Sequence, residues 1–292
     1  MYALRISRLV AAFAALAFLG CGGGDAGDTG DAGMDEPGAG GGAAAGPEIV
    51  DPATITGMIH LTGTPPANEP IDMSEEAVCA QKHSTQPTTQ AVVANNGMLA
   101  NVFVYVKEGL TGSFPAPTEP ATIDQDGCVY IPHVTGVQVG QDITFENSDG
   151  LLHNIKTVPQ NNPTFNISQP TDMTTTRQFQ AAEVMVPVQC DVHGWMHAYI
   201  GVVDHPYFAV SGEDGAFRIE NLPPGTYTIE AWHEKYGPMT QQVTLGPNAT
   251  QEVMFTFDAA AQANAVVPLG TPIDPHDHGP AGSPAKAVNG TH

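Results

Sequence analysis

A short stretch of the chain places a thiol, an imidazole and a thioether close together, at Cys190, His193 and Met196. Their spacing is Cys-x2-His-x2-Met, which lets one loop present all three groups to a common point. Upstream, His153 offers a second imidazole. Copper suits a mixed set of thiolate, imidazole and thioether ligands. The four residues therefore predict a single copper site, with electron transfer as the chemistry that such a site would perform.

The predicted strands around these residues indicate how they would meet. Residues 184–188 and 199–203 are short runs rich in β-branched residues, and the ligand loop lies between them. Residues 142–146 form a similar run shortly before His153. If the ligand loop and His153 lie at the same end of a β-sandwich, the four predicted ligands would come together. Many such short runs, separated by turn residues, predict an all-β fold.

Other uses of the same residues fit the sequence less well. Zinc suits Cys and His ligands but rarely takes Met. A binuclear copper centre would need a second cysteine in the loop, and position 186 is Val186. A multicopper enzyme would need further histidine pairs near this loop, so we expect a protein that is not an enzyme. The remaining alternative is a buried thiol at Cys190 with incidental histidines.

The ligand pattern resembles that of a known family. His153-Asn154, followed by the Cys-x2-His-x2-Met loop at 190–196, is similar to the cupredoxins, which include the plastocyanins and azurins. The short loop is most similar to that of amicyanin. Residues 140–147 also resemble the strand that precedes the first histidine in this family. The resemblance covers residues 121–206 and implies a Greek-key cupredoxin sandwich or barrel with one type 1 (blue) copper.

The same resemblance implies a role for each residue of the site. His153, Cys190 and His193 would be the equatorial ligands, and Met196 would be the weak axial ligand. Asn154 would support the site through hydrogen bonds near the thiolate sulfur.

Two residues beside the ligands leave alternatives open. Trp195 either shields the copper or forms part of the electron exit, and the alternative is a packing residue. His197 directly follows Met196 and competes with it for the axial position. Because adjacent residues on a tight loop usually point apart, we predict Met196 as the ligand and His197 as an exposed edge residue. Electrons are expected to pass through the edge of His193, the ligand nearest the surface.

A second set of motifs lies downstream of the ligand loop. Asp-Gly-Ala-Phe at 214–217 and Leu-Pro-Pro-Gly-Thr-Tyr at 222–227 resemble the carboxypeptidase regulatory-like (transthyretin-like) family. The resemblance implies a small β-sandwich at 207–258, which is short for an independent domain. Predicted strands within an N-terminal β segment at 53–120 would complete it, so that the copper domain is inserted between its two halves. The competing layout assigns residues 53–205 to the copper domain.

The N-terminus resembles an export signal. Arg5 and Arg8 precede an apolar run at 9–20, which is too short to span a bilayer. The run ends in Phe-Leu-Gly-Cys, similar to a bacterial lipobox, in which the cysteine (here Cys21) is lipidated. The alternative is an ordinary signal peptide followed by a chance cysteine. We predict a removed signal peptide at 1–20 and a lipoprotein of a bacterial envelope, periplasmic or at the cell surface.

The chain has 4 cysteines. With Cys21 assigned to the lipid and Cys190 to copper, Cys79 and Cys128 remain. Disulfides persist in exported proteins, so we predict that these two cysteines pair. The alternative is two buried free thiols.

Composition and charge describe the ends of the chain and restrict its partners. Residues 21–52 are rich in Gly, Ala and Asp and predict a flexible, lipidated linker, and residues 259–292 predict a disordered tail. The net charge of −22 at pH 7 argues against a nucleic-acid partner. It favours a basic redox partner, such as a cytochrome or an oxidase subunit.

Two other functions remain open. One is a cell-surface lipoprotein that binds carbohydrate or protein and holds a structural metal, and the other is copper storage or delivery. Isolated histidines are predicted to be surface or packing residues, and those of the tail to be solvated. The isolated histidines are His60, His83, His133, His205 and His233, and the tail contains His276, His278 and His292.

Overall fold

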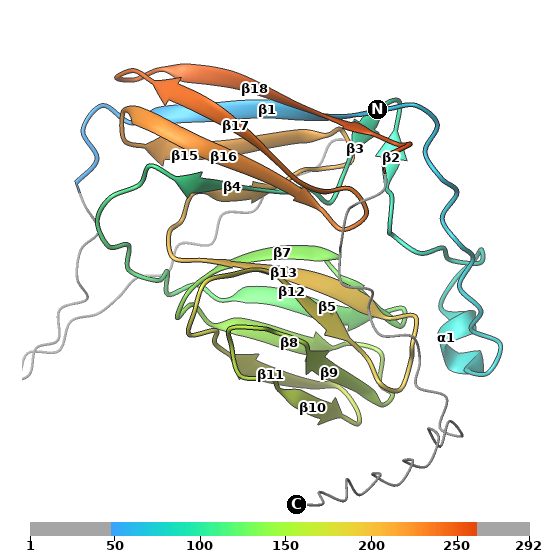
Figure 1. Cartoon of the computed structure of the whole chain (residues 1–292). Coiled ribbons are helices and arrows are strands. Elements are labelled where there is room, and N and C mark those ends of the chain that lie inside the picture. The colour runs from blue at the N-terminus through green and yellow to red at the C-terminus, as the bar shows by residue number, and fades with distance from the viewer. Residues whose placement is uncertain (1–47, 262–292) are drawn as a thin grey trace, which may run out of the picture. The chain divides into compact units, whose positions relative to one another are not determined.

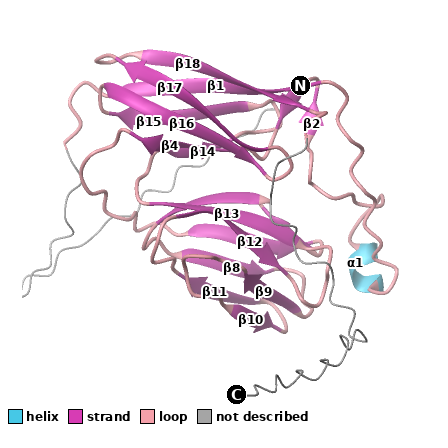
Figure 2. Cartoon of the chain, in the orientation of Figure 1, coloured by secondary structure: helices cyan, strands magenta, loops and turns pink. Residues whose placement is uncertain are grey.

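The computed structural model describes residues 48–261. The predicted signal peptide, the lipidation site Cys21, and nearly all of the predicted linker and tail lie outside the described residues. Within the described part, strands dominate and the one α-helix is the short α1 (Ala77–Gln81), as Figure 2 shows. This confirms the all-β prediction. No helix in residues 48–261 is long and apolar enough to cross a bilayer.

Strands from both ends of the described chain form one β-sandwich, called here the flanking sandwich. One sheet has the order β15-β1-β3-β2 with β18 also paired to β1, and the other has the order β14-β4-β16-β17. Their buried side chains form a single core cluster. The strands are β1 (Ala53–Thr62), β2 (Ala94–Asn95), β3 (Met98–Leu99), β4 (Phe103–Glu108), β14 (Phe208–Val210), β15 (Ala216–Leu222), β16 (Gly225–His233), β17 (Gly237–Leu245) and β18 (Thr250–Asp258).

Strand β1 is the central strand of its sheet. Its side chains alternate between buried and half-buried, as expected for a strand with one face on a core, and Ile55 and Ile59 are fully buried. It pairs in parallel with β18 and antiparallel with β15 (Figure 1), so residues from the two ends of the described chain share one sheet. The strands that flank the predicted copper domain in sequence therefore pair with each other.

Alanine at Gly57 is expected to destabilise the protein by about 1–3 kcal/mol. A Cβ atom at this position of β1 would lie 2.3 Å from the Val253 carbonyl oxygen and 2.3 Å from the Phe217 ring. The carbonyl cannot move without loss of the β1–β18 pairing. Chemical denaturation measures the effect, and Gly246→Ala is the control because a Cβ atom there meets nothing within 4 Å. Equal midpoints for the two variants would contradict this prediction.

The intervening residues form a second β-sandwich, called here the metal-site sandwich. Its sheets have the orders β10-β9-β12-β13-β7 and β11-β8-β5-β6. Strand pairs β5–β8 and β7–β13 are parallel, which requires the chain to cross between the sheets. The strands are β5 (Ala121–Asp126), β6 (Val129–Ile131), β7 (Val134–Gln138), β8 (Ile143–Asn147), β9 (His153–Thr157), β10 (Asn166–Gln169), β11 (Met173–Arg177), β12 (Glu183–Gln189) and β13 (His197–Val203).

The irregular chain between β1 and β2 packs on the metal-site sandwich. Ile71, Met73 and Cys79 belong to the same buried cluster as the strands β5–β13. Cys79 forms a disulfide with Cys128, with a Cα–Cα distance of 5.6 Å. The predicted N-terminal segment at 53–120 thus divides: its strands join the flanking sandwich, whereas the part around Cys79 covers the other core.

Candidate metal centre

Three of the predicted ligands converge at one end of the metal-site sandwich. His153 is the first residue of β9, Cys190 directly follows β12, and His193 lies in the loop before β13. The Nδ1 atoms of the two imidazoles are 2.9 Å apart, and the Cys190 Sγ atom is 3.9 Å from the His193 Nδ1 atom. All three side chains are buried, with exposures of 0%, 3% and 2% in chain order.

The ligand loop is closed by its own backbone. The Cys190 N–H donates to the Met196 carbonyl at 3.1 Å, and the Met196 N–H donates to the His193 carbonyl at 2.9 Å. Met196 is 1% exposed and belongs to the same core cluster as Cys190. The backbone that forms the loop therefore holds all three loop residues near one point.

His197 differs from the sequence-based expectation of an exposed edge residue. It is half-buried, its Nδ1 atom donates to the Trp195 carbonyl at 3.1 Å, and its ring packs edge-on against His133 at 5.5 Å. Met196 belongs to the core cluster that contains Cys190, whereas the His197 ring packs against His133. His133 is 5% exposed, in agreement with the prediction of a surface or packing residue.

The Cys190 sulfur accepts two backbone hydrogen bonds. The N–H groups of Asn154 and His193 each lie 3.4 Å from the Sγ atom. Burial raises the pKa of the thiol, but hydrogen bonds from His153 and His193 and these two N–H groups outweigh it and lower the pKa to about 6. Cys190 is thus available as a thiolate at neutral pH, the form that binds metal.

Asn154 also fastens the ligand loop with its side chain. Its amide oxygen accepts a hydrogen bond from the Asp191 N–H, and its amide nitrogen donates to the Asn166 side chain. These contacts join β9, β10 and the residue after Cys190. Asn154 therefore lies where the resemblance placed it, beside the sulfur.

Asp149 is a residue of the candidate site that the sequence did not predict. Its carboxylate accepts a hydrogen bond from His153 Nε2 at 2.8 Å and forms an ion pair with Lys82 at 2.9 Å. The Asp149 side chain is fully buried. The N–H groups of Gly127 and Cys128 also donate to it, at 2.7 and 2.8 Å. In the sequence, Asp149 before Gly150 indicates only a turn. Three of the four hydrogen-bond and ion-pair partners of Asp149 come from distant segments, so no local pattern could show its role.

The hydrogen bonds of Asp149 orient the first histidine. Burial raises the pKa of the Asp149 carboxyl, but the bonds from His153, Lys82 and two backbone N–H groups prevail and lower it to about 2. The ionised carboxylate holds the proton of His153 on Nε2, which leaves Nδ1 free to bind a metal.

Replacing Asp149 with Asn is expected to weaken copper binding about 10- to 100-fold. The amide has one acceptor atom, so it cannot satisfy His153, Lys82 and the two backbone donors together. Competition with a chelator of known affinity measures the loss. Asp126→Asn is the matched control because Asp126 is an exposed carboxylate near the same lysine. Unchanged affinity in Asp149→Asn would show that His153 needs no such support.

His193 is covered, contrary to the expectation that its edge approaches the surface. Its Nε2 atom lies 4.0 Å from the Cys79 sulfur, and its ring is 5.1 Å from that of Trp195. The Trp195 indole N–H donates to the Cys128 carbonyl at 3.0 Å. The disulfide therefore brings a segment more than a hundred residues away onto the histidine, a contact without any local sequence signal.

The donor atoms fit a copper ion in their type and spacing. An ion bound to two nitrogens at about 2.0 Å and a sulfur at about 2.3 Å sets the nitrogens roughly 3–3.5 Å apart and a nitrogen–sulfur pair roughly 3.5–4 Å apart. The 2.9 Å and 3.9 Å separations are within a few tenths of an ångström of these ranges. The buried thiolate and two imidazoles match the preference of copper.

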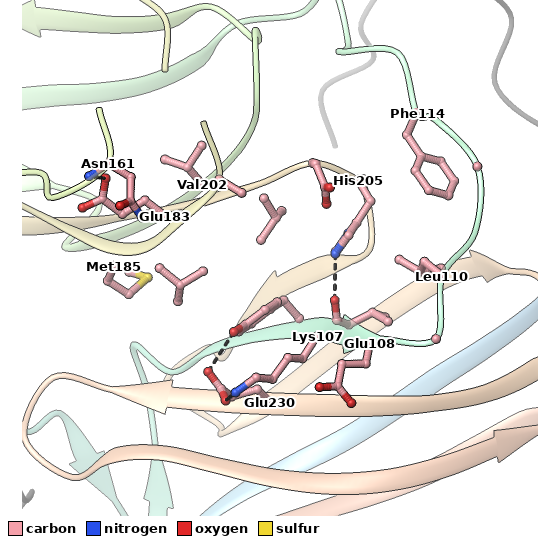
Figure 3. A pocket seen from close by; sticks show the side chains of 18 of the residues that line it. Lys107, Glu108, Leu110, Phe114, Asn161, Glu183, Met185, Val202, His205 and Glu230 are labelled. Carbon is pink, nitrogen blue, oxygen red and sulfur yellow. Dashed lines mark hydrogen bonds and ion pairs between the residues drawn. The ribbon is translucent and has the colours of Figure 1, made fainter. Parts of the chain in front are cut away.

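A separate pocket of about 610 Å³ lies between β4, β12 and the chain after β13. Figure 3 shows Lys107 beside Glu230 and His205 directed at the β4 backbone. Lys107 and Tyr105 both bond to the Glu230 carboxylate, at 2.5 and 2.8 Å, and His205 Nε2 donates to the Val106 carbonyl at 2.7 Å. These polar groups satisfy each other, and we assign no chemistry to this pocket.

Comparisons with known proteins identify one module by sequence. Residues 197–258 match the family model of the carboxypeptidase regulatory-like domain, which confirms the resemblance of the turn motifs. The match runs from β13 to β18 and so begins earlier than residue 207, where we expected this module to start. No curated protein matches the chain.

Several solved copper proteins are weakly similar in structure. A Cu-containing nitrite reductase from Thermus scotoductus SA-01 has a TM-score of 0.28 and 19% identity over 32% of this chain, which spans 24% of the reductase. A purple cupredoxin from Nitrosopumilus maritimus has a TM-score of 0.25 and 23% identity, over 28% of this chain and 98% of its own. An oxidized amicyanin mutant has a TM-score of 0.27 and 18% identity, over 34% and 97%.

Proposed function

We propose that this protein is a carrier of single electrons that binds one type 1 copper through His153, Cys190, His193 and an axial Met196, and that it is not an enzyme. The observation that carries the proposal is the convergence of one thiolate and two imidazoles in a buried site, with a thioether on the same loop. Bound copper would supply one-electron oxidation and reduction.

The surrounding residues would keep the ligands still during electron transfer. Asp149 holds the His153 ring, two N–H groups bond to the Cys190 sulfur, and the loop backbone is closed on itself. The buried ligands exclude water, which limits reorganisation when the charge changes. A covered site also favours a carrier over a copper delivery protein, because delivery requires a recipient to reach the ligands.

Trp195 offers the route by which an electron would leave. Its ring lies against that of His193 and it is half-buried, whereas His193 itself is 2% exposed. Val192, in the same loop, is 47% exposed and offers a partner an apolar contact. We therefore place the exit at Trp195 and the exposed part of the loop.

The terminal sequence and the charge support a proposal for the cellular setting. We propose a lipoprotein exported to a bacterial envelope, tethered to the membrane through Cys21 and the Gly-, Ala- and Asp-rich sequence that follows it. The strongly acidic chain would select a basic redox protein, such as a cytochrome or an oxidase subunit, as partner.

Reconstitution of the full chain with copper(II) tests the proposal. An intense visible thiolate-to-copper band and a reversible one-electron wave in voltammetry are the expected results. A colourless protein that binds zinc at the same ligands would refute it. Copper binding without a reversible wave would instead indicate storage.

A further inference from the structure

A second cluster of ligand side chains lies on the other side of the ligand loop. His133, His197 and Glu234 each offer a ligand atom, and these atoms all lie within 4.8 Å of one another. We propose that this cluster binds one borderline divalent cation, of the zinc class, independently of the copper site. The proposal goes beyond electron transfer and does not depend on it.

The fold brings the three residues together from distant parts of the chain. Strands β7 and β13 are parallel neighbours, with Tyr199 opposite Val134. His133 immediately precedes β7 and His197 begins β13, so both imidazoles lie at the same end of this strand pair. Glu234 follows β16 of the flanking sandwich. Two sheets thus contribute to the cluster.

The side chains of the cluster are largely buried, and hydrogen bonds orient them as in known metal sites. The side chains of His133 and Glu234 are only 4% and 10% exposed, and His133 Nε2 lies 2.6 Å from a Glu234 oxygen. His197 Nδ1 donates to the Trp195 carbonyl, which leaves its Nε2 atom without a proton. A ring nitrogen held by a backbone carbonyl is the usual support for a metal-binding imidazole.

Two imidazoles and one carboxylate select the class of cation. This set binds zinc and other borderline divalent ions, and it contains no thiolate or thioether to favour copper(I). An ion between His133 and Glu234, with bonds of about 2.0–2.2 Å, would replace the shared proton and widen their contact by roughly half an ångström.

A cavity beside the imidazoles leaves room for a fourth ligand. It has a volume of about 20 Å³, and its lining includes His133, His197, Trp195 and Met196. A space of this size holds one water molecule. Three protein ligands with one water describe an open zinc site rather than a closed structural one.

Zinc titration of the copper-loaded full chain tests the proposal. We expect one tightly held zinc per chain in addition to copper, measured by elemental analysis after gel filtration. Replacing His133, His197 or Glu234 with Gln should remove this zinc or weaken its binding at least about tenfold. His60→Gln and the double variant His276→Gln/His278→Gln are matched controls that should retain it, because these histidines are not among the three proposed ligands.

Zinc X-ray absorption of the unmodified protein gives a result that does not depend on how the variants fold. Nitrogen and oxygen neighbours with two imidazoles, and no sulfur, are expected. Absence of a second metal would overturn the proposal. So would a sulfur neighbour, or zinc that persists in Glu234→Gln and His133→Gln but disappears in the tail variant.

Discussion

Replacing Cys190 with Ser is expected to abolish the visible thiolate-to-copper band and to weaken copper binding by roughly a hundredfold or more. The sulfur is the only free thiol in the described chain, and two backbone N–H groups and both histidines are directed at it. A hydroxyl at neutral pH keeps its proton and gives no such band. Absorption spectra and chelator competition measure the two effects.

A matched substitution separates the loss of the ligand from disturbance of the loop. Val192 lies two residues away on the same loop and is 47% exposed, so Val192→Ala should keep the band and the affinity. If Cys190→Ser still forms an intensely coloured copper complex, the thiolate is not a ligand. The electron-transfer proposal would then fail.

Removing the Cys79–Cys128 disulfide is expected to lower the free energy of unfolding by about 4 kcal/mol, because the bond closes a loop with a sequence separation of 49. The substitutions are Cys79→Ser and Cys128→Ser together. Both cysteines are fully buried, so the two serine hydroxyls would be placed in apolar surroundings, which adds to the loss. Denaturant unfolding measures the change.

The same double variant should expose the copper ligand. His193 Nε2 lies 4.0 Å from the Cys79 sulfur, and the Trp195 indole bonds to the Cys128 carbonyl. Release of this segment should therefore increase the rate of electron exchange with small soluble oxidants, measured by stopped flow. Ser84→Ala, at an exposed position of the same segment, is the control. An unchanged rate in a variant that has lost stability would show that the disulfide does not cover the site.

The pH dependence of stability follows from Asp149. Its pKa is lowered to about 2 in the folded protein, below the usual value of an aspartate. A group whose pKa falls on folding contributes stability that is present above its unfolded pKa and is lost as pH falls through the folded value. The contribution of Asp149 should thus be complete at neutral pH and disappear between about pH 4 and pH 2.

Local sequence was sufficient to predict the donor side chains of the candidate copper site. Cys190, His193 and Met196 are close in sequence, and ligand type and spacing are properties of a single loop. The strand-forming runs on either side also follow from local composition, because β-branched and aromatic residues favour strands wherever they occur. The all-β fold and the regulatory-like turn motifs could be predicted for the same reason.

The surroundings of the site could be decided only by the tertiary structure. Asp149, the cover over His193, and the cluster of His133, His197 and Glu234 all depend on contacts between segments far apart in sequence. No local pattern encodes such contacts, because they arise when strand pairing and the disulfide bring separate segments together. Local sequence therefore specifies the candidate ligands of the loop, whereas folding decides which groups orient them, which segments cover them and which side chains form the neighbouring cluster.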